Sequence, residues 1–274
     1  MNWLYYLLEA NLYLLVFYLA YRLLMRRETF YQLNRAYLLG SSAIAFAIPF
    51  MQLGILKPQV IPAVLSRVYI VQPADMGAVH THGQVQITTP ANYYLLIYAI
   101  VAGILLIHFC YKIYRLVRLS YGGKKRKGNA FKLIEIEDEV PAFSFFGYLF
   151  INKNLVASDT IIRHELVHIR QRHSLDIIYL ELLKIVCWFN PALYLLQDSI
   201  KELHEYIADE DINYSQQDIN NYTDFLLSNA YGTYQTSLTN NFFDKRLLKN
   251  RIIMLHQKRS GYLARLKYLI VLPL

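Results

Sequence analysis

The chain has 274 residues, of which 55% are hydrophobic, 18% are charged and 24 are tyrosines. Soluble domains have about 25% charged residues, so this composition predicts a membrane protein, in which Tyr suits the bilayer interfaces. The net charge of +8 arises from Lys and Arg beside apolar runs, so we expect no direct binding to nucleic acid. Cys110 and Cys187 have no Cys-x-x-Cys partners, which argues against a disulfide framework and against a thiolate zinc ribbon.

Three apolar runs in the first half of the chain are predicted to be transmembrane helices, over about residues 3–24, 36–56 and 93–111. Each is about as long as the ~20 residues that cross a bilayer core. No signal-peptide cleavage pattern follows the first run, so we interpret it as a retained anchor. Residues 57–92 contain four prolines and two glycines and are predicted to form an external loop.

Basic residues predict the orientation of these helices. Positive residues favour the cytoplasmic side, which places the N-terminus outside and everything after the third run in the cytoplasm. The residues that carry this prediction are Arg22, Arg26, Arg27 and Arg35, and then Lys112, Arg115, Arg118, Lys124, Lys125, Arg126 and Lys127.

The character of the chain changes after residues 119–130, which are predicted to be a solvated basic linker. Residues 132–137 alternate polar and apolar, as a half-buried strand does, and residues 141–152 favour one or two strands around Gly147. Residues 143–150 are a candidate edge strand for holding a peptide substrate, although a place in the core of the sheet fits them equally well.

A helix-compatible run then carries His-Glu-x-x-His, from His164 to His168. Residues four apart share a helix face, so both imidazoles can point at one ion, and Glu165 can reach a water bound to that ion. This is the pattern of a zinc site with a glutamate general base. Residues 175–196 follow as two amphipathic helices or one kinked helix, lying on the bilayer or on the zinc helix; a fourth span remains an alternative.

Residues 200–211 are predicted to form a helix with Glu205 and Asp209 on one face. Catalytic zinc takes three protein ligands, and Glu205 can supply the third. Asp209 is placed to hydrogen-bond a ligating imidazole. Glu202 and His204 remain rival third ligands, and a solvated acidic face is the non-functional interpretation.

The rest of the chain is predicted to contain a basic helix over residues 247–258. An apolar stretch over residues 261–274 resembles the start of another membrane helix, either cut short or a short final anchor. Between residues 240 and 246 lies an exposed-looking segment that we consider a conceivable self-cleavage site.

Taken together, these motifs resemble the membrane metallopeptidases of the BlaR/MecR family of β-lactam sensor-transducers. The resemblance rests on the three predicted spans and on the sequences Pro-Ala-Phe-Ser-Phe-Phe-Gly, Arg-His-Glu-Leu-Val-His-Ile, Trp-Phe-Asn-Pro and Glu-Tyr-Ile-Ala-Asp. It implies a gluzincin-type peptidase with one Zn²⁺ held by His164, His168 and Glu205, with Glu165 as catalytic base and Asp209 as orienting carboxylate. Family sensors also carry a penicillin-binding domain with a Ser-x-x-Lys motif, which nothing here matches, so β-lactam sensing is not implied.

The expected fold is a mainly α membrane protein. It comprises a membrane domain at 1–118, an α+β zinc metallopeptidase domain at 131–260 and the start of a C-terminal span at 261–274. We expect a bacterial inner-membrane protein that cleaves a cytoplasmic protein, such as a repressor, or itself, in transmembrane signalling. The alternatives are a quality-control protease like the HtpX and CAAX-protease group, and a non-catalytic scaffold stabilised by zinc. The sequence leaves the oligomeric state open.

Overall fold

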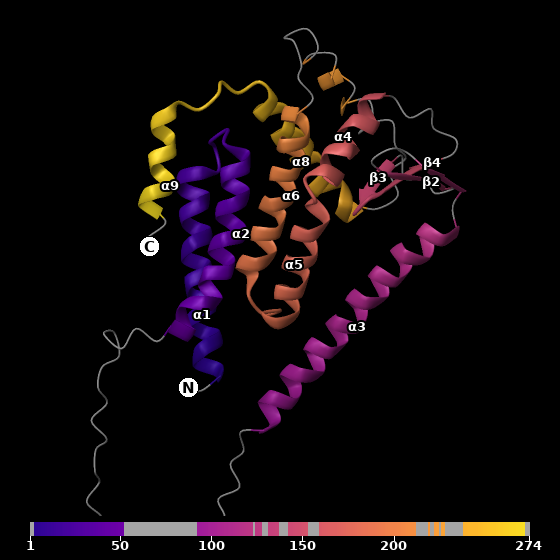
Figure 1. Ribbon diagram of the computed structural model, residues 1–274. Helices are drawn as coiled ribbons and strands as arrows, with labels where there is room; N and C mark the ends of the chain where they lie inside the picture. The colour runs from indigo at the N-terminus through magenta and orange to yellow at the C-terminus, as the bar shows by residue number, and fades with distance from the viewer. Residues whose placement is uncertain are drawn as a thin grey trace, which may run out of the picture.

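The computed structural model (Figure 1) describes residues 3–51, 92–122, 124–127, 131–136, 142–152, 159–211, 219, 222–224, 226–227 and 238–271. The predicted external loop at 57–92 lies outside these residues. Helix α1 (Trp3–Ala20) continues through a π-helical turn (Tyr21–Met25). The chain then reverses, and α2 (Tyr31–Ala47) runs back antiparallel to α1.

Among the described residues, two helices are long and apolar enough to cross a membrane, over Tyr5–Met25 and Tyr93–Gly122. The second lies within α3 (Asn92–Gly122), one continuous helix that carries the predicted third span on through its basic residues. The predicted span at 36–56 is not confirmed. Its helix, α2, is 17 residues long and is followed by a short 3-10 turn (Ile48–Met51), and residues 52–56 lie outside the described part.

A four-stranded sheet follows α3, in the order β1-β2-β4-β3. Its strands are β1 (Lys124–Lys127), β2 (Lys132–Ile136), β3 (Ala142–Phe145) and β4 (Tyr148–Asn152). Strands β2 and β4 pair in parallel, and the outer pairs are antiparallel. The prediction for β2 and for strands on both sides of Gly147 is confirmed.

The basic run Lys124–Lys127 was predicted to be part of a solvated linker, but it forms strand β1. Lys124 pairs with Glu135 and Lys127 pairs with Lys132, so the run is an edge strand. Charge composition favoured a solvated segment, but the open edge of β2 offers backbone hydrogen bonds to any extended chain. Lysine is a residue that edge strands commonly carry.

Helices α4 (Asp159–Arg170), α5 (His173–Val186) and α6 (Pro191–Asp211) form the centre of the molecule. The interpretation of 175–196 as two helices is confirmed, because the chain reverses at residues 187–190. Asn190 begins α6, since its side chain accepts a hydrogen bond from the Ala192 N–H at 2.8 Å. The Asn190 amide also donates to Asn11 of α1, which fixes the tip of this hairpin against the first helix.

The C-terminal part of the chain returns to the N-terminal helices. Helix α8 (Leu238–Leu255) packs on α6, and a 3-10 turn (Tyr262–Arg265) leads into α9 (Leu266–Val271), which lies beside α1 (Figure 1). The Tyr268 hydroxyl donates to Asn34 at 2.6 Å, and Lys267 pairs with Glu28.

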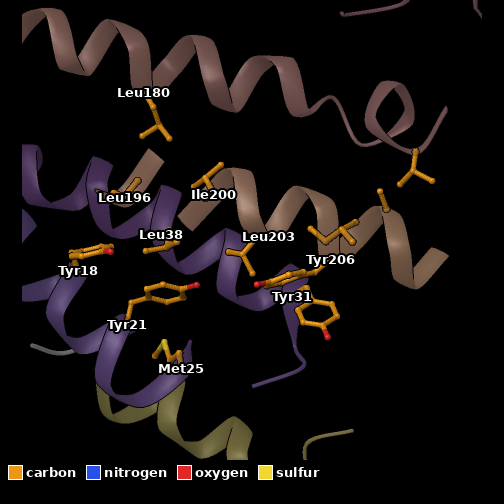
Figure 2. Close-up of a cluster of buried hydrophobic side chains, with 13 residues drawn as sticks. Tyr18, Tyr21, Met25, Tyr31, Leu38, Leu180, Leu196, Ile200, Leu203 and Tyr206 are labelled. Atoms are coloured by element: carbon orange, nitrogen blue, oxygen red, sulfur yellow. The ribbon is translucent and has the colours of Figure 1, made fainter. Parts of the chain in front are cut away.

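The largest apolar core joins the N-terminal helices to α5 and α6, as Figure 2 shows. Leu38 of α2 is fully buried together with Ile200 of α6, and the rings of Tyr31 and Tyr206 meet at 5.4 Å. Burying a large apolar side chain contributes about 1.5–3 kcal/mol. This core therefore fixes the position of α6, and with it the acidic side chains near the C-terminal end of that helix.

Candidate metal centre

The predicted metal ligands come from two helices that pack against each other. Helix α4 carries His164 and His168 one turn apart, and α6 carries Glu205. Asp159 begins α4, where an acidic side chain interacts favourably with the helix dipole, and it also pairs with Arg163 at 2.7 Å.

One donor atom from each of these three side chains lies within 4.8 Å of the other two. The Nε2 atom of His164 is 3.2 Å from Oε2 of Glu205 and 3.2 Å from Nε2 of His168. The Nε2 atom of His168 is 3.6 Å from Oε1 of Glu205. Tetrahedral zinc with bonds of about 2.0–2.1 Å has ligand atoms about 3.3 Å apart. These spacings and this donor set therefore fit one zinc ion.

The predicted orienting carboxylate, Asp209, lies behind His164. Its Oδ1 atom is 3.5 Å from Nδ1 of His164 and accepts a hydrogen bond from the Tyr222 hydroxyl at 2.9 Å. Tyr222 in turn lies 3.3 Å from the same His164 nitrogen. Such partners fix the orientation of a ligating imidazole.

Arg251 of α8 binds both carboxylates of this group. Its Nε and Nη2 atoms donate to Asp209 at 2.9 and 2.6 Å, and Nη1 lies 2.9 Å from Oε2 of Glu205. Sequence reasoning did not single out Arg251 or Tyr222. Arg251 lies in the stretch that was interpreted only as a basic helix, 42 residues from Asp209, and Tyr222 lies outside the motifs, 13 residues from Asp209.

Glu165 lies beside the three donors and is half-buried. Its carboxylate forms a hydrogen bond with the side chain of Ser144 on β3. Burial raises the pKa of Glu165 above its ordinary value, although His164 opposes that shift. The candidate base therefore lies where α4 packs against β3, at the edge of the sheet.

The ligand side chains have strongly shifted affinities for protons. Burial would raise the pKa of Glu205, but Arg251 and the two histidines hold it well below its usual range. Burial lowers the pKa of His168 to about 4. At neutral pH Glu205 is therefore ionised and His168 is neutral, which are the states that bind a metal ion.

On the other side of His168 the structure brings together polar residues that the sequence did not place beside one another. Nδ1 of His168 is 2.7 Å from Nδ1 of His173, whose ring stacks on His204 at 3.8 Å and 7°. His204 hydrogen-bonds Asp176 at 2.8 Å, and Arg35 of α2 donates to the same carboxylate at 2.6 Å. Burial lowers the pKa of His173, so its ring is neutral.

The rival third ligands lie apart from the metal group. His204 faces Asp176, and the buried Glu202 accepts a hydrogen bond from Asn250 at 3.2 Å and lies 3.5 Å from Arg26. The segment considered for self-cleavage, residues 240–246, lies within α8. Its backbone is helical, and self-cleavage there stays a prediction.

The family model described as BlaR1 peptidase M56 matches residues 152–255. The resemblance to a BlaR/MecR-type peptidase domain is confirmed. The matched segment runs from the end of β4 to the end of α8 and contains the three candidate metal ligands together with Glu165, Asp209, Tyr222 and Arg251. M56 peptidases are zinc metallopeptidases, and the match supports a membrane-associated metallopeptidase. None of the curated proteins matches the chain.

Proposed function

We propose that this protein is a zinc metalloendopeptidase of a bacterial inner membrane, with its metal site on the cytoplasmic side. The observation that carries the proposal is the metal group itself. His164, His168 and Glu205 present donor atoms 3.2–3.6 Å apart, as tetrahedral zinc requires. A structural zinc site has no need of a base, so Glu165 at the same place favours catalysis over a scaffold role.

In this proposal the two histidines and Glu205 hold the ion and Asp209 orients His164. A zinc ion bound there would lower the pKa of its water to about 7 and polarise the scissile carbonyl. Glu165 takes the proton of the attacking water and passes it to the leaving amine. The Ser144 side chain holds the Glu165 carboxylate beside β3 while it does so.

Strand β3 is the proposed binding edge for the substrate backbone. In the described sheet β3 pairs only with β4, which leaves its other side open. The candidate stretch at 143–150 thus contains parts of two strands. Strand β3 is the candidate edge, whereas Leu149 and Phe150 of β4 are buried between β2 and β3 and belong to the core of the sheet. A peptide added along β3 would lie next to α4, against which β3 packs, and so next to Glu165.

The orientation in the membrane is supported by the basic residues at one end of the helices. The turn between α1 and α2, the C-terminal end of α3 and helix α4, which carries His164 and His168, lie towards the same end of the molecule (Figure 1). Basic residues favour the cytoplasmic side, so the metal site faces the cytoplasm and the N-terminus lies outside. In this proposal α2 spans the membrane antiparallel to α1, and α9 is the start of a C-terminal span. The protein would then cross the membrane several times. The residues concerned are Arg22, Arg26, Arg27, Arg35, Lys112, Arg115 and Arg118.

A site on that side would act on a cytoplasmic protein, such as a repressor, or on the chain itself, as a step in signalling. The test compares cells that carry the wild type, Glu165→Gln and the control Glu210→Gln, by proteomics and by metal analysis of the purified proteins. Glu210 is an exposed carboxylate of α6. We expect equal zinc in all three and one cleaved partner that is lost only in Glu165→Gln, because a missing general base costs about 10²–10⁴-fold in rate. Cleavage that survives in Glu165→Gln would refute the mechanism, and loss of many unrelated proteins would indicate quality control instead.

A further inference from the structure

We propose that His173 is a positioning residue for the metal ligand His168, acting through the hydrogen bond between their Nδ1 atoms. The proposal rests on the proposed zinc site. A metal-binding histidine nearly always donates its second ring N–H to a carboxylate, carbonyl or water, which fixes the tautomer and the ring orientation. For His164 these partners are Asp209 and Tyr222, whereas His168 faces another imidazole at 2.7 Å.

This short contact holds a single hydrogen atom, because one Nδ1 must donate and the other must accept. If His168 binds the ion through Nε2, its Nδ1 keeps the hydrogen and donates it. His173 must then accept at Nδ1 and carry its own hydrogen on Nε2. That Nε2 atom is fully buried and has no hydrogen-bond partner among the residues that the structure describes.

An unpaired buried polar atom is unfavourable whether it is a donor or an acceptor. In the opposite tautomer Nε2 of His173 would be an unpaired acceptor, and a hydrogen would stand on the His168 nitrogen that faces the metal group. Because Nε2 of His173 is unpaired in both tautomers, the need to free Nε2 of His168 for a metal ion decides between them.

The plane of the His173 ring is itself held in place. The ring is 3% exposed and stacks on His204 at 3.8 Å, almost parallel to it. Asp176 binds Nε2 of His204 at 2.8 Å, and Arg35 binds Asp176 and the backbone carbonyl of Gln171 at 2.6 and 2.9 Å. A residue of the N-terminal helix α2 thereby contributes to the alignment of a metal ligand on α4.

Two substitutions separate the hydrogen bond from the packing. His173→Phe keeps a ring to stack on His204 but removes the acceptor. His173→Asn loses the ring but places an oxygen where Nδ1 was. The control is His256→Phe, at an exposed histidine of the turn after α8. Each full-length protein is purified in detergent, and zinc affinity is measured by competition with a chelator, together with thermal unfolding of the zinc-free form and the absorption spectrum of the Co²⁺ form.

We expect His173→Phe to weaken zinc binding by about 10–100-fold and to change the Co²⁺ spectrum, because the orientation of His168 is no longer fixed. His173→Asn should bind zinc nearly as well as the wild type, even where its zinc-free form unfolds at a lower temperature. Wild-type affinity in His173→Phe, or a loss in His173→Asn as large as that in His173→Phe, would overturn the proposal while leaving the zinc site intact. A wild-type protein that binds no zinc would overturn the proposed function, and this inference with it.

Discussion

Arg251 offers a direct test of how the acidic side of the metal group is balanced. Its side chain is 14% exposed and contacts both Asp209, which is 3% exposed, and Glu205. We predict that Arg251→Gln destabilises the zinc-free protein strongly, because it leaves two buried carboxylates without their shared cation. Removing one partner of a buried ion pair typically costs about 3–5 kcal/mol.

The effect should be smaller with zinc bound. Zinc would itself balance Glu205, so only Asp209 would lack a partner in the loaded variant. With about 2–4 °C per kcal/mol for a chain of this size, the zinc-free variant should unfold about 6–20 °C below the wild type. The substitution should therefore cost less stability in the zinc-bound protein than in the zinc-free protein. Zinc should then raise the unfolding temperature of the variant by more than it raises that of the wild type.

The assay is thermal unfolding of the purified full-length protein in detergent, with and without saturating zinc. Arg259→Gln is the matched control, since Arg259 is 85% exposed and lies 3.7 Å from Glu210. Exposed ion pairs contribute about 0–1 kcal/mol, so this control should barely change. If Arg251→Gln shifted the zinc-free unfolding temperature no more than Arg259→Gln does, the ion-pair reasoning would be wrong. A zinc-induced gain smaller than that of the wild type would refute the role of zinc as the replacement cation.

Two further predictions concern the core and the hairpin. Leu203→Ala should cost about 2–5 kcal/mol of stability, since Leu203 is 1% exposed in the shared core, while Ile253→Ala on α8, at 51% exposed, should stay within about 1 kcal/mol. Equal unfolding temperatures for these two variants would contradict the packing shown in Figure 2. Asn190→Ala should cost about 1 kcal/mol or more, because α6 loses its N-cap and Asn11 loses a partner. An unfolding temperature equal to that of the wild type would show that the cap contributes nothing.

The parts of the site that sequence could predict are those set by local geometry. The spacing of His164 and His168 places both imidazoles on one face of any helix, whatever surrounds it. The same periodicity relates Glu205 to Asp209. The sequence favoured Glu205 but left Glu202 and His204 open as rival third ligands. The structure brings Glu205 to the two histidines, since the rotation of α6 about its axis is set by the core that it shares with α1 and α2.

The parts that sequence could not predict depend on contacts between distant segments. Arg251 reaches Asp209 across 42 residues, and Arg35 reaches Asp176 across 141 residues. No periodicity encodes such pairings. His173 lies only five residues from His168, yet its role also depends on the turn at Arg172, whose left-handed backbone (φ 54°) directs the chain from α4 into α5.

The division into a membrane domain at 1–118 and a peptidase domain at 131–260 describes the order of the chain but not its packing. The family model matches 152–255, yet Leu196, Ile200 and Leu203 of that segment are buried in a cluster completed by α1 and α2. A peptidase segment without the N-terminal helices would expose this apolar face and would also lose Arg35. The N-terminal helices therefore do more than anchor the peptidase: they close its core, and a displacement of α2 would act on α6, which carries Glu205, and on the group that orients His168.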